Sequence, residues 1–165
     1  MNHQVNDNQE ESMKKPIDIH LTKEGLFSFE KEYQAILDRR PEVLARLVAA
    51  REQGDLSENA GYHAAKDELS AMDRRLGELK LIFRFAEVIE PNQDGIVGLG
   101  SCVTVENESV VSKFTIVGAL EADPAKNKLS DVSPIGSSLI GKKIGKTVEI
   151  DVPQGKVRYR IISIK

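Results

Sequence analysis

Two acidic residues, Asp55 and Glu58, lie three positions apart in the short segment GDLSENAG, between two stretches with a helical pattern. Carboxylates about one helical turn apart at an exposed tip can share a hard cation such as Mg²⁺. The same spacing is typical of a capping box, in which Asp55 is the N-cap and Glu58 reaches back to it. Two carboxylates do not fill an octahedral shell, so a partner would have to supply the remaining ligands. Spacing alone leaves both interpretations open.

The residues before this segment predict two helices that would carry it. Thr22 can cap a first helix that runs to about Arg39. Proline disfavours helical geometry in the residue before it, and it fits the first turn of a new helix. We therefore expect a helix boundary at Pro41 and a second helix over residues 42–53.

The residues after Gly54 predict a long helix with a coiled-coil seam. Apolar residues there are spaced alternately three and four apart, which is the 3.5-residue period of coiled-coil packing. The seam consists of Tyr62, Ala65, Leu69, Met72, Leu76, Leu79, Phe83 and Ala86. A helix of roughly 27 residues would be roughly 40 Å long. We expect it to pack against the preceding helices as a hairpin, which projects as an arm with Asp55 and Glu58 at its tip.

A different pattern begins after Pro91. Stretches rich in β-branched residues alternate with Gly, Asn, Asp and Pro, which predicts short strands and turns. The expected strands are 96–97, 101–105, 113–117, 146–152 and 156–162, with one short helix at 137–140. The expected fold class is α+β. We predict a disordered tail at 1–16, a coiled-coil hairpin domain at 17–91 and a mostly antiparallel β domain at 92–165.

Composition and charge exclude several classes of function. The net charge of −3 argues against general binding to duplex nucleic acid. It divides unevenly: residues 1–91 carry 13 Lys and Arg against 18 Asp and Glu, and residues 92–165 carry 10 against 8. The single cysteine, Cys102, allows neither an intrachain disulfide nor a thiolate metal cluster. No apolar run approaches the roughly 20 residues of a membrane span, and the N-terminus lacks the apolar core of a signal peptide. We expect a cytoplasmic protein.

Residues 47–63, LVAAREQGDLSENAGYH, closely resemble the tip of the Gre family of bacterial transcript-cleavage factors, of GreA type. The similarity extends across almost the whole chain, through LTKEGL, RRPEV, AEVIEP, FTIVGALEADP and SPIGSSLIGKKIG. It implies an N-terminal antiparallel two-helix coiled-coil arm and a C-terminal domain with an FKBP-like fold, that of the FK506-binding prolyl isomerases. Prolyl isomerase activity itself is not expected, because residues 92–165 contain only two aromatic residues, Phe114 and Tyr159.

The resemblance also implies a function. A transcription elongation factor of this family docks on bacterial RNA polymerase through its C-terminal domain, and its arm enters the secondary channel. There it stimulates the polymerase's own cleavage of backtracked RNA at the extruded 3′ end, and any relation to the DNA of the complex is indirect. Asp55 and Glu58 would complete the shell of the second catalytic Mg²⁺ and position the attacking water. The factor would be a monomer, not an enzyme on its own, and would share Mg²⁺ with polymerase rather than hold it stably alone.

Further residues near the tip are candidates for contact with RNA: Asn59, Tyr62, His63, Arg46, Arg51 and Lys66. Each has an ordinary alternative. Tyr62 fits the apolar seam, His63 fits a helix surface, and the three basic side chains suit either RNA phosphate or solvent. In the second domain, Ser133, Pro134 and Ile135 match the family segment implicated in docking on polymerase, although Val132 stands where a polar or acidic residue is common.

The sequence departs from the family at Gly61, where an acidic residue is usual. A glycine in the first turns of a helix costs up to about 1 kcal/mol, and the missing negative charge puts the efficiency of cleavage in question. Two other functions stay open, the first of them supported by Gly61. One is a Gre-fold inhibitor that occupies the channel without promoting cleavage. The other is a chaperone-like module that binds through the apolar seam and does not depend on Mg²⁺.

Overall fold

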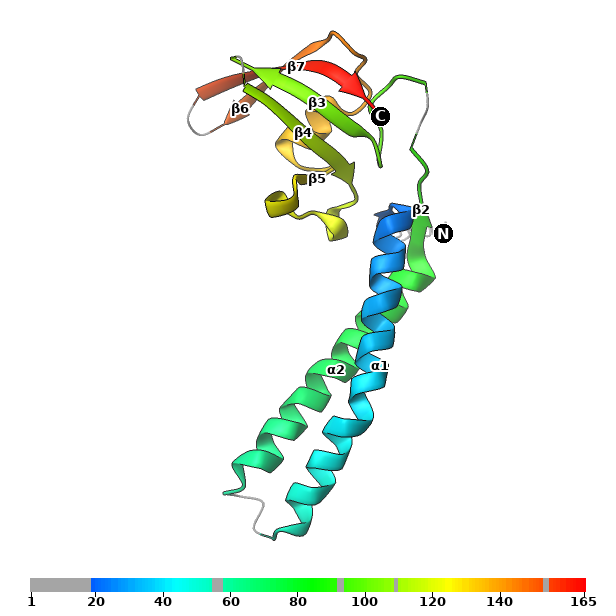
Figure 1. The fold of residues 1–165 in the computed structure, drawn as a ribbon, viewed down its shortest axis with the longest axis vertical. Helices are drawn as coiled ribbons and strands as arrows, with labels where there is room; N and C mark the ends of the chain where they lie inside the picture. The colour runs from blue at the N-terminus through cyan, green and yellow to red at the C-terminus, as the bar shows by residue number, and fades with distance from the viewer. Residues whose placement is uncertain (1–18, 55–57, 92–93, 109, 153–154) are drawn as a thin grey trace, which may run out of the picture.

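The computed structural model describes residues 19–54, 58–91, 94–108, 110–152 and 155–165, so the tail predicted at 1–16 lies outside the described residues. A long helical hairpin forms one end of the molecule and a curled β-sheet forms the other (Figure 1). The elements in chain order are β1 (Ile19–Leu21), α1 (Lys23–Glu52), α2 (Ala60–Phe85), β2 (Ala86–Val88), β3 (Cys102–Asn107), β4 (Val110–Val117), η1 (Ala119–Glu121), η2 (Pro124–Lys126), β5 (Lys128–Ser130), α3 (Pro134–Leu139), β6 (Thr147–Val152) and β7 (Gly155–Ile164). The α+β fold class is confirmed.

The arm consists of α1, with 30 residues, and α2, with 26 residues. Thr22 is the N-cap of α1, as predicted, and its hydroxyl accepts a hydrogen bond from the Gly25 N–H at 3.0 Å. The predicted seam of α2 faces α1: Ala65, Leu69, Met72, Leu76 and Leu79 are buried, and Tyr62, Phe83 and Ala86 are half-buried. Among the described residues, no helix is both long enough and apolar enough to cross a membrane.

The helix boundary predicted at Pro41 is wrong, because α1 continues through this residue. A proline inside a helix removes one backbone hydrogen bond and costs about 3 kcal/mol. Packing against α2 on both sides of the proline offsets this cost. Val43 is fully buried in a cluster with α2, and Ile36 and Leu47 pack against the same cluster from the turns on either side.

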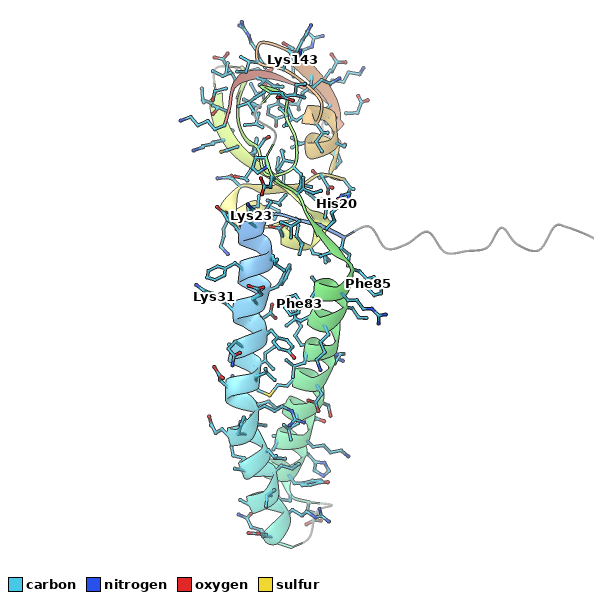
Figure 2. The ribbon with its side chains drawn as sticks, turned by 90° about the vertical axis from the view of Figure 1, so that its right-hand side faces the viewer. His20, Lys23, Lys31, Phe83, Phe85 and Lys143 are labelled. Atoms are coloured by element: carbon cyan, nitrogen blue, oxygen red, sulfur yellow. The ribbon has the colours of Figure 1, made fainter. Side chains whose placement is uncertain are left out.

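A short parallel pair of strands closes the base of the arm. Residues 19–21 of β1 pair with residues 86–88 of β2, so the chain enters and leaves the arm side by side. The paired segment covers an apolar cluster in which Leu21 and Leu79 are fully buried. Figure 2 shows Phe83 pointing between the two helices, and its ring meets the edge of Tyr33 with 5.6 Å between centroids. The pairing of β1 with β2 was not predicted from the sequence.

The second part is a five-stranded sheet in the order β5-β4-β3-β7-β6, antiparallel except for the parallel pair β4–β5. Four predicted strands are confirmed with shifted ends, as β3, β4, β6 and β7. The prediction at 96–97 reduces to one isolated bridge between Ile96 and Lys143, and β5 was not predicted. The core under the curled sheet includes Val97, Val103, Val105, Ile116, Leu139, Val148, Ile150 and Ile161.

Candidate functional site at the tip of the arm

The tip begins where α1 ends. Gln53 is the C-cap, and Gly54 follows with a φ of 101°, a left-handed conformation that glycine adopts without strain. The next residues, 55–57, lie outside the described residues. The joint action of Asp55 and Glu58 therefore remains a prediction. Glu58 is described and its side chain is exposed.

Asn59 organises the other side of the turn. Its Oδ1 accepts a hydrogen bond from the Tyr62 N–H at 3.0 Å, which makes Asn59 the N-cap of α2. Its Nδ2 donates to the Ala50 carbonyl oxygen at 2.9 Å, which joins the start of α2 to the last turn of α1. Asparagine suits both tasks because its amide is an acceptor and a donor at once.

This geometry overturns the capping-box interpretation. The N-cap of α2 is Asn59 rather than Asp55, and α2 begins at Ala60. Glu58 precedes the cap instead of standing at the third helical position, where a capping box requires it. Capping thus does not explain why position 58 is a glutamate. Glu58 directly precedes Asn59, the residue that bonds to both helix ends.

The aromatic pair beside the tip is partly structural. Tyr62 is half-buried in the seam, and His63 is exposed. Their rings meet edge to face with 5.5 Å between centroids and an interplanar angle of 74°. Tyr62 therefore packs in the seam and against His63, and His63 is accessible to a partner.

The three basic candidates differ in their surroundings. The Arg46 guanidinium donates to Glu68 at 2.7 Å, and Arg39 pairs with the same carboxylate. Arg51 and Lys66 are exposed near the tip. An ion pair across the two helices thus occupies Arg46, whereas Arg51 and Lys66 are better placed to meet a phosphate.

Gly61 is the second residue of α2 and is exposed. A Cβ atom at this position would lie 3.3 Å from Asn59 Oδ1, so a side chain there would require only a small adjustment of the cap. The structure therefore gives no steric reason for the departure from the acidic residue that is usual in the family.

At the opposite end of the molecule, the predicted docking segment begins α3. The Ser133 hydroxyl accepts from the Gly136 N–H at 3.0 Å and donates to the Ser130 carbonyl oxygen at 2.6 Å. Ile135 packs against the core of the sheet, and Pro134 is exposed. The short helix starts at residue 134 rather than at the predicted 137 because Ser133 caps it. Ser133 and Ile135 thus stabilise the turn through the cap and the core. The role of all three residues in docking remains a prediction.

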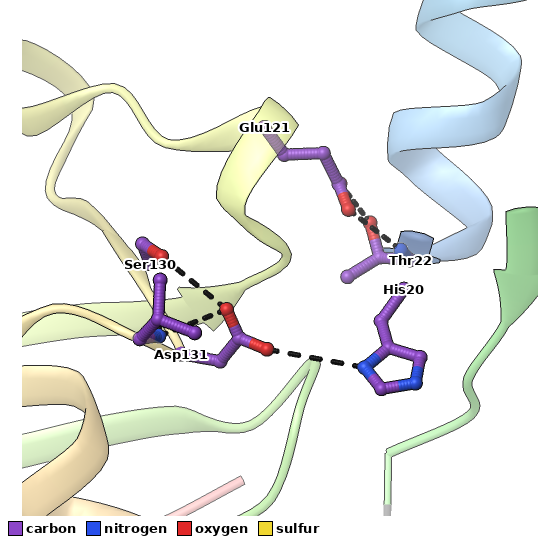
Figure 3. Close-up of polar contacts among 6 residues, drawn as sticks. His20, Thr22, Glu121, Ser130 and Asp131 are labelled. Carbon is purple, nitrogen blue, oxygen red and sulfur yellow. Dashed lines mark hydrogen bonds and ion pairs between the residues drawn. The ribbon is translucent and has the colours of Figure 1, made fainter. Parts of the chain in front are cut away.

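A further contact, which the sequence did not reveal, joins the base of the arm to the sheet domain. The Glu121 carboxylate accepts hydrogen bonds from the Thr22 backbone N–H at 2.7 Å and from the Thr22 hydroxyl at 2.5 Å (Figure 3). Beside it, His20 Nδ1 lies 4.0 Å from an Asp131 carboxylate oxygen. The one available signal was Gly25, because a glycine in the first turn of a helix is unfavourable unless something approaches closely.

Comparison with known sequences decides the family. Residues 19–88 match the GreA/GreB family described as "Transcription elongation factor, N-terminal". Residues 92–165 match the family described as "Transcription elongation factor, GreA/GreB, C-term". The chain belongs to the GreA/GreB family of transcription elongation factors. The resemblance drawn from the sequence is confirmed.

Individual GreA/GreB relatives match over most of their length. Transcription elongation factor GreA of Thermomicrobium roseum is 38% identical over 89% of this chain and 97% of its own. The GreA of Bacillus cytotoxicus is 41% identical over 88% and 95%. Among solved structures, GreA factor homolog 1 of Thermus thermophilus is 28% identical over 90% of this chain and 99% of that one, with a TM-score of 0.42. A GreA/GreB factor from Nitrosomonas europaea is 22% identical over 90% and 99%, with a TM-score of 0.41.

The tip was predicted to share a Mg²⁺ ion with a partner through Asp55 and Glu58, and Glu58 is the described residue of that pair. Within the described ranges, no group of three or more His, Cys, Asp or Glu side chains is placed to hold a metal ion. Glu58 offers an exposed carboxylate, which is the kind of ligand that Mg²⁺ prefers. A role of this carboxylate in a Mg²⁺ site shared with a partner remains a prediction.

Proposed function

We propose that this GreA/GreB factor enters the secondary channel of bacterial RNA polymerase and stimulates the polymerase's own cleavage of backtracked RNA. One observation carries the proposal beyond family membership. Glu58 is exposed at the far end of the arm. Asn59, not Glu58, caps the helix and joins the two helix ends, so the Glu58 carboxylate has no role in capping. A carboxylate placed there is available to an active site outside this chain.

The shape of the arm supports delivery of this carboxylate into a confined site. With 30 residues, α1 is about 45 Å long at 1.5 Å per residue. The sheet domain lies at the opposite end from the tip (Figure 1). A two-helix rod can reach through a channel that excludes the domain at its base.

The tip residues have separate roles in this proposal. Asp55 and Glu58 supply carboxylate oxygens, and polymerase and RNA supply the remaining ligands. Mg²⁺ bound there would stabilise the charge that develops on the oxygens during phosphodiester hydrolysis. Asn59 holds the backbone next to Glu58, and Arg51 and Lys66 attract RNA phosphate. In this proposal polymerase and RNA complete the site, so the factor is not an enzyme on its own.

The sheet domain supplies most of the affinity for polymerase in this proposal. The exposed residue of the docking segment is Pro134, and the neighbouring Val132 is 74% exposed. Ser133 and Ile135 hold this turn in place through the cap and the core, as described above.

An RNA cleavage assay on a backtracked polymerase complex tests the proposal. Adding the protein in the presence of Mg²⁺ should release a 3′ fragment of the RNA and restore synthesis. The protein without polymerase should not cut RNA. Blocked synthesis with no fragment released would contradict the proposal and support a Gre-fold inhibitor instead. RNA cutting by the purified protein alone would contradict its non-enzymatic character.

A further inference from the structure

A carboxylate of the sheet domain bonds directly to the start of the arm. Glu121 belongs to η1 in the sheet domain, and it accepts two hydrogen bonds from Thr22, 99 positions away. Thr22 is the N-cap of α1. The carboxylate therefore lies at the positive end of the helix dipole, which favours a negative charge. Figure 3 shows this contact bridging η1 and the start of α1.

Two glycines make room for this contact. A Cβ on Gly25 would lie 1.9 Å from Glu121 Oε1, inside the space that the carboxylate occupies. A Cβ on Gly118 would lie 1.8 Å from the His20 carbonyl oxygen, so β1 and the start of η1 also approach at backbone distance. The joint is thus closely packed on both sides of Glu121, and both glycines are required by contact between the two parts of the molecule.

The joint lies at the base of a long lever. A rotation of about 5° at Thr22 would move the tip of a helix about 45 Å long by about 4 Å. Chemistry at a metal site tolerates far less, because a misplacement of about 1 Å can reduce a rate about 100-fold. Whatever fixes the direction of α1 therefore fixes where Glu58 arrives.

We propose that Glu121 is a positioning residue that sets the direction of the arm relative to the sheet domain. The inference rests on the proposed function, since it assumes that the sheet domain docks while the tip acts. Glu121 does not touch RNA or metal in this proposal. It acts through Thr22, and its loss should reduce cleavage at saturation without weakening binding.

The central variant is Glu121→Ala in the full-length protein, with Asp151→Ala as the control. Asp151 is an exposed residue of β6 in the same domain, so both variants lose one negative charge. Glu121→Ala should lower the rate of RNA cleavage at saturating factor by about tenfold, within the range that misplaced catalytic groups produce. Binding, measured by competition with the unmodified protein, should stay unchanged, and Asp151→Ala should leave both quantities unchanged.

A second measurement follows the direction of the arm without polymerase. Spin labels on Ser70→Cys in α2 and Lys113→Cys in β4, in a Cys102→Ser background, report the distance between arm and sheet domain. Both labelled positions are exposed. Glu121→Ala should broaden the distance distribution while helix content stays the same. If the unmodified protein fails to stimulate cleavage, the proposed function is wrong, but this distribution still tests the role of Glu121.

Gly25→Ala separates positioning from simple stability. Alanine favours a helix over glycine by up to about 1 kcal/mol, so a role of Gly25 confined to the helix itself predicts a neutral or stabilising change. The positioning view predicts reduced cleavage and a broadened distribution, because the new methyl group displaces the Glu121 carboxylate. In the Glu121→Ala background, Gly25→Ala should have little further effect, which a double-mutant cycle measures. An unchanged distribution and cleavage rate in Glu121→Ala would overturn the inference.

Discussion

Both ends of α1 are held by a polar side chain from outside the helix, but the two side chains come from very different places in the chain. At the tip, Asn59 bonds to Ala50, nine positions away. At the base, Glu121 bonds to Thr22, 99 positions away. The first contact forms with the turn itself, whereas the second requires the sheet domain to be folded and in place. Local contacts thus shape the tip, to which we assign the chemistry, and a long-range contact holds the base, where we propose that it directs the arm.

The largest effect should come from the tip. The double change Asp55→Ala and Glu58→Ala should abolish stimulated cleavage, because it removes both proposed carboxylate ligands. Polymerase binding should remain close to normal, since the proposed docking segment lies at the other end of the molecule. Cleavage at saturating factor, compared with competition for polymerase, measures the two quantities separately. A variant that binds and cleaves at the original rate would leave Asp55 and Glu58 without a catalytic role.

Core substitutions test whether the two ends belong to independent domains. Leu79 in the arm and Leu139 under the sheet are both fully buried. Each Leu→Ala change should cost about 2–5 kcal/mol of folding free energy. We predict that Leu79→Ala exposes the arm to limited proteolysis while the segment 92–165 stays resistant, and that Leu139→Ala does the reverse. Loss of both parts together in either variant would contradict the domain boundary proposed near residue 91.

Changes at Asn59 should have a smaller effect, confined to the tip. Asn59→Ala removes the N-cap of α2 and the bond to Ala50, and a lost cap costs about 1 kcal/mol. Asn59→Asp is the matched variant, because it keeps the acceptor for Tyr62 but loses the amide donor to Ala50. Hydrogen exchange in the first turn of α2 should accelerate in the alanine variant. In the aspartate variant, only the last turn of α1 should exchange faster. Equal exchange in both variants and the unmodified protein would show that Asn59 does not hold the tip.

The smallest effect concerns pH. The hydrogen bond from the Arg75 guanidinium, with its charge, holds the pKa of Glu32 below the ordinary value. A lowered pKa in the folded state stabilises the arm above the unfolded pKa of about 4.3, and this contribution is lost as the pH falls through the folded value. The pair is more than one-third exposed, so solvent screening limits its contribution to about 0.5 kcal/mol. Glu32→Gln should flatten the dependence of arm stability on pH between about 5 and 3. The same slope in both proteins would contradict this assignment.

Features that depend on neighbouring residues were predictable from the sequence. The N-cap at Thr22, the seam of α2, the turn at Gly54 and four strands all follow from local patterns, and all are confirmed. The family resemblance favoured the Mg²⁺ interpretation of Asp55 and Glu58 over capping, a choice that spacing alone left open. Local patterns do not show how two helices pack against each other. The prediction at Pro41 failed for this reason, because packing against α2 stabilises α1 as one continuous helix.

Features that join distant segments were missed. The pairing of β1 with β2 and the addition of β5 to the sheet each involve only three residues per strand, too few for a recognisable period. At the tip, several residues could serve as the N-cap of α2. Asn59 is distinguished by a second hydrogen bond, from its amide to Ala50 in the other helix, which the sequence does not show. At the base, nothing near Glu121 in sequence indicates that its partner is Thr22.

The parallel pair of β1 and β2 has a consequence for engineering. Because Leu21 pairs with Val88, the two ends of the segment between them lie side by side. The segment can therefore be exchanged as a unit without a change in the length of the linkers on either side. A chimera that carries the 19–88 segment of a relative should fold with its original connections, provided that the transplanted helix keeps a threonine and a glycine where Glu121 meets it.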